Sequence, residues 1–417
     1  MTKNTENSKD ALQEEYIRSS CTSLKFSNTN KIDELHTFID EYKRVLELFI
    51  DYLWELGENS TIPRLLPKEI TSSVGTWMTA RAVQACAKQS SGIVRGTRTK
   101  QKRRLAQIKK FNEQKMFKKA RKLQKIHDET KNTKPKINEV CPELDSRFVK
   151  LDLENETSFD GWITLTCLGN NFKITLPFKK TKHFTKMLKK GKIKQGVRIS
   201  KTSVTFNFAL LITTPKTQGI TVGLDKGVKN VYSLSDKQES TDDIHGWNLD
   251  KIIKKMSRQT KGSRAFDKSQ KHRKNYIHWC LNQIDFSNIK TLNSEKIINM
   301  RKGKRTSKYL SRWTYTIIDN KLKDLALEHG VHVKELSPVY TSQRCSKCGW
   351  TCKTNRKGKK FVCKCGFAAD ADYNASLNIS FDLPEISKAE QLMHLNRKGF
   401  YWNALGKEPI VLSVQAA

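Results

Sequence analysis

The chain is short of acidic residues and lacks any long apolar run. Its 417 residues include 42 Asp and Glu against 78 Lys and Arg, a formal net charge of +36 at pH 7. Such an excess repels itself unless a polyanion neutralises it, so we expect nucleic acid as the partner, bound in a strongly salt-dependent way. No stretch of about 18 apolar residues occurs, so we expect no membrane span. The N-terminal segment MTKNTENSKDALQEEY lacks the apolar core of a secretory signal, which favours a cytoplasmic protein.

Ten cysteines, four of them clustered as metal ligands would be, suit a reducing cytosol better than a disulfide framework. Four of them form two short pairs with 14 residues between the pairs: Cys345-x-x-Cys348 and Cys363-x-Cys365. Gly349 and Gly366 follow the pairs, where a hairpin knuckle needs positive φ. Zn²⁺ takes four such thiolates in a tetrahedron, so the spacing predicts a structural zinc ribbon. The second pair is C-x-C, which leaves Cys352 open as a substitute ligand.

A second motif follows the cysteines directly. It reads Asp370-Ala-Asp372-Tyr373-Asn374-Ala375 and continues with apolar residues that can start an amphipathic helix. The ordered series YTSQ-x-C-x-x-C-G, a second Cys pair and D-x-D-Y-N-A resembles the C-terminal signature of the TnpB (OrfB) family of transposon-encoded nucleases, which compact type V CRISPR effectors share.

This resemblance implies an RNA-guided DNA endonuclease that hydrolyses phosphodiesters with Mg²⁺ in a RuvC-like (RNase H-like) domain interrupted by a zinc ribbon. It also implies a guide RNA and target double-stranded DNA as partners, no membrane, and a prokaryotic cytoplasmic protein that is nucleoid-associated when bound to DNA. Whether the guide derives from a transposon end or a CRISPR array, and whether one copy or a homodimer assembles, stays open.

The hydrophobic pattern changes period along the chain. Apolar residues recur every three or four positions from Lys31 to Trp54, which predicts a helix that Gly57 ends. Helical periodicity resumes from about Ser72 into the 130s, where the sequence becomes strongly basic. After a linker with prolines, residues 148–210 alternate as short strands do. The family resemblance makes these strands, with a first strand at 21–27, a wedge-type β-barrel carrying a helical recognition insertion.

We therefore expect a multidomain α/β plus β-barrel protein. The expected regions are a disordered tail at 1–16, a first wedge strand at 17–30, a helical recognition domain at 31–132, a wedge β-barrel at 133–218, a first RuvC-like segment at 219–340, the zinc ribbon at 341–367, a second RuvC-like segment at 368–382, and a C-terminal tail at 383–417, for which we have no functional interpretation.

Three carboxylates are the candidate Mg²⁺ ligands. In-line phosphodiester cleavage uses metal ions about 4 Å apart, held by bridging and terminal carboxylates. Asp225 ends an apolar strand in G-I-T-V-G-L-D-K-G, which resembles the first hairpin of an RNase H-like fold. The family motif places its last acid two residues before Asn374, which selects Asp372 and leaves Asp370 to cap the helix.

The middle carboxylate has two candidates. Glu295 lies about where the family carries its glutamate, and Ile297 fits the family pattern, but Asn293-Ser294 stands where that pattern has apolar residues. Glu335 follows a clearer strand but lies only ten residues before Cys345. We select Glu295 and keep Glu335 as the alternative.

Several basic stretches could follow a nucleic-acid backbone or be solvated surface. They are residues 95–136, 178–194, taken as a loop, and 251–284, where Arg258, Lys261, Arg264, Arg273 and Lys274 stand out. Residues 300–313 could be a lid over the active site or a surface loop.

Two other functions compete with the nuclease. One is a nuclease-inactive RNA-guided DNA-binding repressor, which would keep the fold, charge and zinc. The other is an unguided nucleic-acid-binding transposition accessory protein.

Overall fold

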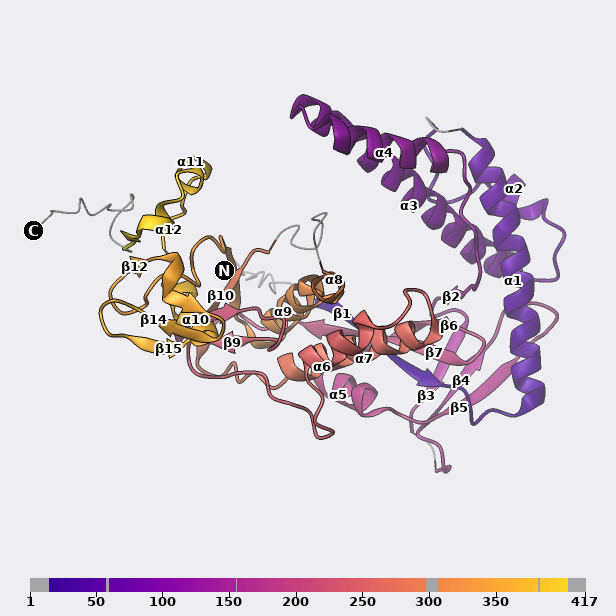
Figure 1. Ribbon diagram of the computed structural model, residues 1–417. Coiled ribbons are helices and arrows are strands. Elements are labelled where there is room, and N and C mark those ends of the chain that lie inside the picture. Colours follow the sequence, from indigo (N-terminus) through magenta and orange to yellow (C-terminus); the bar gives the residue numbers. More distant parts are fainter. Residues whose placement is uncertain (1–14, 58–59, 155, 298–306, 382, 404–417) are drawn as a thin grey trace, which may run out of the picture. The chain divides into compact units, whose positions relative to one another are not determined.

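The computed structural model describes residues 15–57, 60–154, 156–297, 307–381 and 383–403 (Figure 1). The chain divides into two compact units, Met1–Leu211 and Ile212–Ala417. The expected disordered tail lies outside the described residues up to residue 14, while Glu15 and Tyr16 already belong to a strand. No described helix is long and apolar enough to cross a membrane.

The helices of the first unit follow the predicted periodicity. Helix α1 spans Thr29–Glu55 and buries one apolar face: Leu35, Phe38, Ile39, Tyr42, Val45, Leu46, Phe49, Ile50 and Leu53. Gly57 follows with φ 85°. The second helical region is divided into α2 (Lys68–Ser72), α3 (Ala80–Glu113) and α4 (Phe117–Thr130). Lys115, at φ 53°, makes the turn between α3 and α4.

Seven strands of the first unit form two antiparallel sheets. One sheet has the order β1-β7-β6-β2 and the other the order β3-β4-β5. The strands are β1 (Glu15–Ser23), β2 (Glu143–Leu144), β3 (Val149–Asp152), β4 (Gly161–Leu165), β5 (Ile174–Phe178), β6 (Gly191–Ile199) and β7 (Ser203–Leu211). Both sheets share one core with α1 and α3. Backbone pairing among the described residues does not close them into one barrel.

The basic stretch at 178–194 is not the loop we predicted. Helix α5 spans Lys182–Lys190, and β6 begins at Gly191. Phe184 and Met187 are buried on one side of α5, while its lysines stay on the other. Phe184 and Met187 are three residues apart, which is the spacing of one helix face. The many lysines between and around them made this pattern hard to detect in the sequence.

The second unit is built on a mixed sheet of order β11-β10-β8-β9. Strands β8 (Ile220–Asp225), β10 (Ile289–Glu295) and β11 (His332–Leu336) are parallel, and β9 (Ser233–Leu234) runs antiparallel to β8. Helices α6 (Leu249–Ser257), α7 (Arg264–Leu281), α8 (Lys308–Arg312) and α9 (Tyr315–His329) connect these strands. Of the suggested lid, residues 300–306 lie outside the described residues, and α8 occupies much of the rest.

The cysteine-rich segment forms small strands beside helix α10 (Ala371–Ser380). A three-stranded sheet comprises β13 (Arg356–Lys357), β14 (Lys360–Val362) and β15 (Ala368–Asp370), after a 3-10 turn at Lys353–Asn355. The C-terminal segment returns through α11 (Lys388–Leu392) and α12 (Leu395–Lys398) to β16 (Phe400–Tyr401), which pairs with β12 (Trp350–Thr351). Residues 383–403 of the tail are therefore part of this folded region, and residues 404–417 lie outside the described residues.

Helix α10 lies directly on strand β8 because one residue there has no side chain. A Cβ on Gly223 would lie 2.0 Å from the Ser376 carbonyl oxygen and 2.5 Å from the Ser380 nitrogen. Both atoms belong to the helix backbone, which cannot give way as a flexible side chain can. Gly223 therefore sets the closest distance between helix and sheet.

We expect Gly223→Ala to lower the free energy of unfolding by about 1–3 kcal/mol or more, as overpacking of a tight contact does. Chemical denaturation measures this change. Gly92→Ala is the matched control, because a Cβ on Gly92 in α3 meets nothing within 4 Å. That change should stabilise the protein by about 0.5–1 kcal/mol through better helix propensity. Equal effects of the two substitutions would contradict the close contact.

Candidate active site

Two of the predicted carboxylates lie at the same edge of the central sheet. Asp225 is the last residue of β8, and Glu295 is the last residue of the neighbouring parallel strand β10. Leu224 is in register with Ser294, so the two acids come one residue later on each strand. Since parallel strands end at one edge, residues far apart in the sequence become neighbours there.

The third carboxylate comes from the first turn of α10. Asp370 is the N-cap residue: its Oδ1 accepts the N–H of Asp372 at 2.8 Å and that of Tyr373 at 3.1 Å. This confirms the capping expected of Asp370. The Asp370 carboxylate is therefore used to cap the helix backbone. Asp372 lies in the first turn of the helix, and its side chain is 15% exposed.

The three carboxyl groups share one electrostatic environment. Burial raises the pKa of Asp225 well above its usual value, and the charges of Glu295 and Asp372 raise it further. Burial likewise raises the pKa of Glu295. The Thr341 hydroxyl opposes this rise by donating to Glu295 Oε1 at 2.6 Å. Carboxyl groups whose pKa burial and neighbouring charges raise, as at Asp225, are typical of functional sites and of sites that hold cations.

Two basic side chains already partly neutralise this site. The Nη2 of Arg356 lies 2.8 Å from Asp372 Oδ1. The Nζ of Lys226 lies 2.6 Å from Asp319 Oδ1, and the Lys226 side chain is only 1% exposed. Both cations lower the pKa values of Asp225 and Glu295, against the larger effect of burial.

Glu335, the alternative middle carboxylate, has other partners. Its two carboxylate oxygens lie 3.1 Å from Lys323 Nζ and 3.6 Å from Lys296 Nζ. The hydrogen bond from Lys323 is the main cause of its lowered pKa. Glu335 thus belongs to a partly exposed ion-pair group, whereas Glu295 is buried beside Asp225. This arrangement favours Glu295 over Glu335.

Hard oxygen donors of this kind suit Mg²⁺. Asp225, Glu295 and Asp372 therefore fit the chemistry of this ion.

The four thiols of Cys345, Cys348, Cys363 and Cys365 form a compact cluster. The Sγ atoms of Cys345 and Cys365 lie 3.7 Å apart, and those of Cys348 and Cys363 lie 3.6 Å apart. Thiolates bound to tetrahedral Zn²⁺ at about 2.3 Å lie about 3.8 Å from one another, so the spacing could hold this ion. The pKa of Cys365 is lowered to about 7, chiefly by the hydrogen bond from the Phe367 N–H and further by hydrogen bonds with the other three cysteines. Cys352 is not in the cluster; its Sγ contacts Thr354 Oγ1.

The cysteine-rich segment also holds α10 in place. Asn374 Oδ1 accepts the N–H of Ser346, between Cys345 and Cys348, at 3.1 Å. Asn374 Nδ2 donates to the Arg344 carbonyl at 2.8 Å, and Asn378 Nδ2 donates to the same carbonyl at 2.7 Å. The metal-ligand segment is thus bonded to the helix that carries Asp372.

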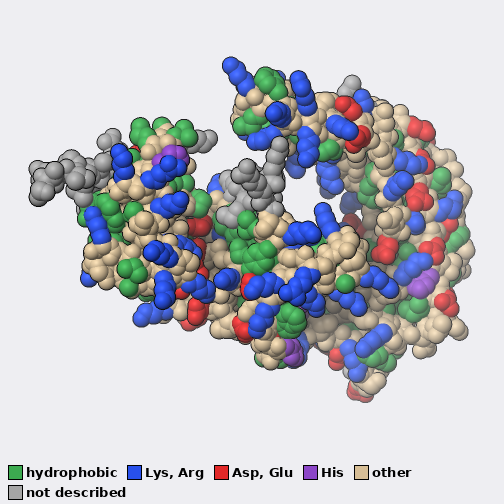
Figure 2. Space-filling model, in the orientation of Figure 1, with side chains coloured by type: hydrophobic (Ala, Val, Ile, Leu, Met, Phe, Trp, Pro, Cys, Tyr) green, Lys and Arg blue, Asp and Glu red, His purple; other side chains and the backbone are tan. Residues whose placement is uncertain are grey.

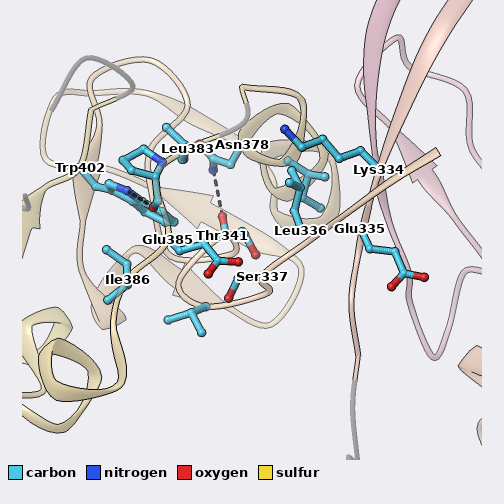
Figure 3. Close-up of a pocket in the computed structure, with 13 residues that line it drawn as sticks. Lys334, Glu335, Leu336, Ser337, Thr341, Asn378, Leu383, Glu385, Ile386 and Trp402 are labelled. Atoms are coloured by element: carbon cyan, nitrogen blue, oxygen red, sulfur yellow. Dashed lines mark hydrogen bonds between the residues drawn. The ribbon is translucent and has the colours of Figure 1, made fainter. Parts of the chain in front are cut away.

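The described part of the C-terminal tail lines a cavity together with Thr341, the residue that donates to Glu295. A cavity of about 240 Å³ is lined by Thr341 and Asn378 on one side and by the tail residues Leu383, Ile386 and Trp402 on the other (Figure 3). The Trp402 carbonyl accepts from Arg344 Nε at 2.6 Å. The tail therefore supports the residues that hold Glu295 and α10, a role that its sequence did not reveal.

Basic side chains gather over α6 and α7 (Figure 2). Arg258, Lys261, Arg264 and Lys274 are exposed there, as a backbone-binding face requires. Arg273 is buried and donates to the Arg312 carbonyl, so it is not part of this face. The position of a basic residue on its helix decides whether its side chain is exposed, and a count of basic residues in the sequence cannot show this.

Sequence reasoning missed Thr341, Arg356 and Asn374 as parts of the site. Thr341 and Asn374 lie in the YTSQ and D-x-D-Y-N-A motifs that carried the family resemblance, but nothing in their spacing identified their partners. Arg356 lies between the two cysteine pairs, and no motif in the sequence distinguishes it from the lysines around it.

We expect Arg356→Gln to shift the pH below which Mg²⁺ affinity is lost upward, toward neutral pH. Arg356 lowers the pKa values of Asp225 and Glu295, so its loss leaves both carboxyl groups protonated at higher pH and unable to bind Mg²⁺. The measurement is Mg²⁺ affinity between pH 5 and 8, about the range over which raised carboxyl pKa values act.

The metal-free protein provides a second test of the same charges. Carboxyls whose pKa is raised in the folded state contribute stability at low pH and lose it as pH rises through the folded value. The free energy of unfolding in chelator should therefore fall more steeply with rising pH in Arg356→Gln than in wild type. Lys357→Gln, the exposed neighbour in β13, should match wild type; a shift in both variants would show a general charge effect.

Comparison with known proteins places this geometry in context. Residues 315–379 match the family model described as Cas12f1-like, TNB domain. The chain is 35% identical over 145 residues to a CRISPR-associated endodeoxyribonuclease Cas12f1 of Sulfoacidibacillus thermotolerans, covering 34% of this chain and 33% of that protein. It is 39% identical over 95 residues to a TnpB-like protein of Aquifex aeolicus, covering 21% and 31%.

The chain thus spans about a third of the length of these curated relatives. Among solved structures, it resembles that of a Cas12f1-sgRNA-target DNA complex with a TM-score of 0.48 and 15% identity, over 85% of this chain and 82% of that one.

Proposed function

Because the chain is related to TnpB and the compact type V CRISPR effectors, we propose that it is an RNA-guided DNA endonuclease with a RuvC-like active site. One observation carries the proposal: Asp225, Glu295 and Asp372 come from three separate elements to a single sheet edge, where the charges of the last two raise the pKa of Asp225. Carboxyl groups gathered at one place with a raised pKa are typical of functional sites, which supports a catalytic role.

In the proposed site, Asp225, Glu295 and Asp372 hold Mg²⁺. The bound ions would supply a nucleophilic water and stabilise the leaving oxygen of the cleaved phosphodiester. Thr341 keeps the Glu295 carboxylate oriented by donating to it. Arg356 pairs with Asp372 and offsets part of the negative charge of the three acids.

The four cysteines hold structural Zn²⁺ in this proposal. The ion would lock the segment around Ser346, whose N–H is bonded to Asn374 of α10. The ribbon thereby fixes the helix that carries Asp372. Zinc supplies no chemistry to the cleavage itself, because its four ligand positions are all taken by the protein.

The remaining features follow the family resemblance. Pairing with the guide RNA would select the target in double-stranded DNA, while exposed basic residues on α3, α6 and α7 would contact the backbones without reading sequence. The protein would act in the prokaryotic cytoplasm, on the nucleoid when bound to DNA. The presence of all three acids favours the nuclease over the inactive repressor.

A cleavage assay tests this function. The protein is purified from cells that also contain its native flanking DNA, and the complex is given a plasmid library with targets matched to the bound RNA. We expect Mg²⁺-dependent cuts only in plasmids with a matched target. Cleavage that ignores the target sequence would argue for an unguided nuclease, and binding without cuts would favour the repressor.

A further inference from the structure

Strand β10 departs from the apolar pattern of the family that the chain resembles at Asn293 and Ser294. Among the described residues, only the Asn293 side chain of these two has a hydrogen-bond partner, through its Nδ2. Asn293 is 1% exposed, and its Nδ2 lies 3.0 Å from the Ile379 carbonyl oxygen and 3.5 Å from that of Ser380. Both carbonyls belong to the last turn of α10 and can only accept. The adjacent amide atom must therefore be the donating nitrogen, which fixes the orientation of the side chain.

Ser294 is equally buried, at 2%, but its hydroxyl has no hydrogen-bond partner among the described residues. Successive residues of a strand point to opposite faces, so Ser294 faces away from α10 while Asn293 faces it. Burial of an amide in place of an apolar side chain is costly unless the amide is bonded. The bonds from Nδ2 to the end of α10 offset part of this cost, while Asn293 Oδ1 is buried without a hydrogen-bond partner among the described residues.

The register of the sheet places this contact beside another one. Asn293 is directly opposite Gly223 on β8, the residue whose missing Cβ lets α10 approach. Two residues further along the strands, on the same face, stand Asp225 and Glu295. The pair Gly223 and Asn293 thus contacts the C-terminal end of α10. The pair Asp225 and Glu295 supplies two carboxylates near the N-terminal turn of the same helix, which carries Asp372.

We propose that Asn293 is a positioning residue that fixes the last turn of α10 to β10, and so sets the distance from Asp372 to Asp225 and Glu295. The proposal rests on the function proposed above. The end carbonyls of a helix lack partners within the helix, so a donor from the strand restrains both the sliding and the rotation of α10. Gly223 sets the height of the helix over the sheet, and Asn293 sets its position along the sheet.

Mg²⁺ binding to the full-length protein, measured by titration calorimetry, tests this role. Asn293→Leu restores the apolar family pattern and removes the donor. We expect it to weaken Mg²⁺ binding about tenfold, as loss of a ligand-orienting partner does. The Mg²⁺ concentration for half-maximal cleavage should rise by the same factor, with zinc content unchanged. Asn293→Asp should bind Mg²⁺ more weakly than Asn293→Leu, because its carboxylate would face two carbonyl oxygens and repel them.

Ser294→Ala is the matched control and should bind Mg²⁺ as wild type does. Asn293→Leu that also binds Mg²⁺ as wild type would overturn the proposal. If Asn293→Leu does not fold, Asn293→Ser takes its place, with hydrogen exchange across residues 371–381 as a second readout. Faster exchange together with weaker Mg²⁺ binding supports the proposal, and wild-type exchange overturns it.

The outcomes also separate this proposal from the one on which it rests. A wild-type protein that binds Mg²⁺ but never cuts DNA would contradict the nuclease function and leave the role of Asn293 measurable by calorimetry. A wild-type protein that cuts, with Asn293 variants that bind Mg²⁺ equally well, would contradict only the positioning role.

Discussion

Asp225→Ala is expected to abolish DNA cleavage while leaving RNA-dependent DNA binding intact. Asp225 is the carboxylate most affected by its neighbours, since Glu295 and Asp372 both raise its pKa. It therefore lies where ions held by all three acids would be shared. Loss of about 4 kcal/mol of transition-state stabilisation would slow cleavage about a thousandfold. Binding should persist, because the basic faces that we propose to contact nucleic acid do not involve Asp225.

The measurement pairs a cleavage time course with a gel-shift assay on the same preparation. Glu335→Gln is the control, because Glu335 is also an acid at this end of the sheet but is paired with Lys296 and Lys323. It should cleave at close to the wild-type rate. Full cleavage by Asp225→Ala would refute the assignment of the site. Loss of cleavage in both Asp225→Ala and Glu335→Gln would indicate Glu335 as the middle carboxylate.

Cys363→Ser is expected to lose zinc, stability and cleavage together. Structural Zn²⁺ sites contribute on the order of 10 kcal/mol to the folding of the segment that they organise. Cys363 is buried in the small core of the cysteine-rich segment with Cys345 and Phe361. Without the ion, the knuckle around Ser346 would no longer hold Asn374, and Asp372 would lose its place over the sheet.

Metal analysis of the purified protein, thermal unfolding and cleavage measure these three losses. Cys352→Ser is the control: this cysteine is nearby and buried, but lies outside the cluster of four thiols. It should retain one zinc per chain and cleave normally. Loss of zinc in Cys352→Ser, with zinc kept in Cys363→Ser, would reassign the ligand set.

Local patterns carried the features of the fold that could be predicted. Helix α1 and strands β3, β4, β5 and β7 lie close to the segments where periodicity indicated them, because each buries one face and repeats its apolar residues accordingly. The two cysteine pairs were visible because metal-ligand spacing is short in sequence. The capping role of Asp370 followed from its position before a helix.

Long-range contacts account for what could not be predicted. Gly223 reads as an ordinary strand glycine until α10 is placed on it, and Asn293 reads as a defect in an apolar strand until the Ile379 carbonyl is placed beside it. Thr341 and Glu295 are 46 residues apart in sequence and joined only by the fold. A one-dimensional pattern contains no information on these pairs.

Sequencing the RNA that co-purifies with the protein, expressed beside its native flanking DNA, tests the central claim most directly. A guided nuclease predicts one discrete RNA of defined length that ends in a variable segment, and the origin of that segment separates transposon from CRISPR guides. Random host RNA of mixed length would contradict guiding, and it would leave a general nucleic-acid binder whose three neighbouring carboxylates need another explanation.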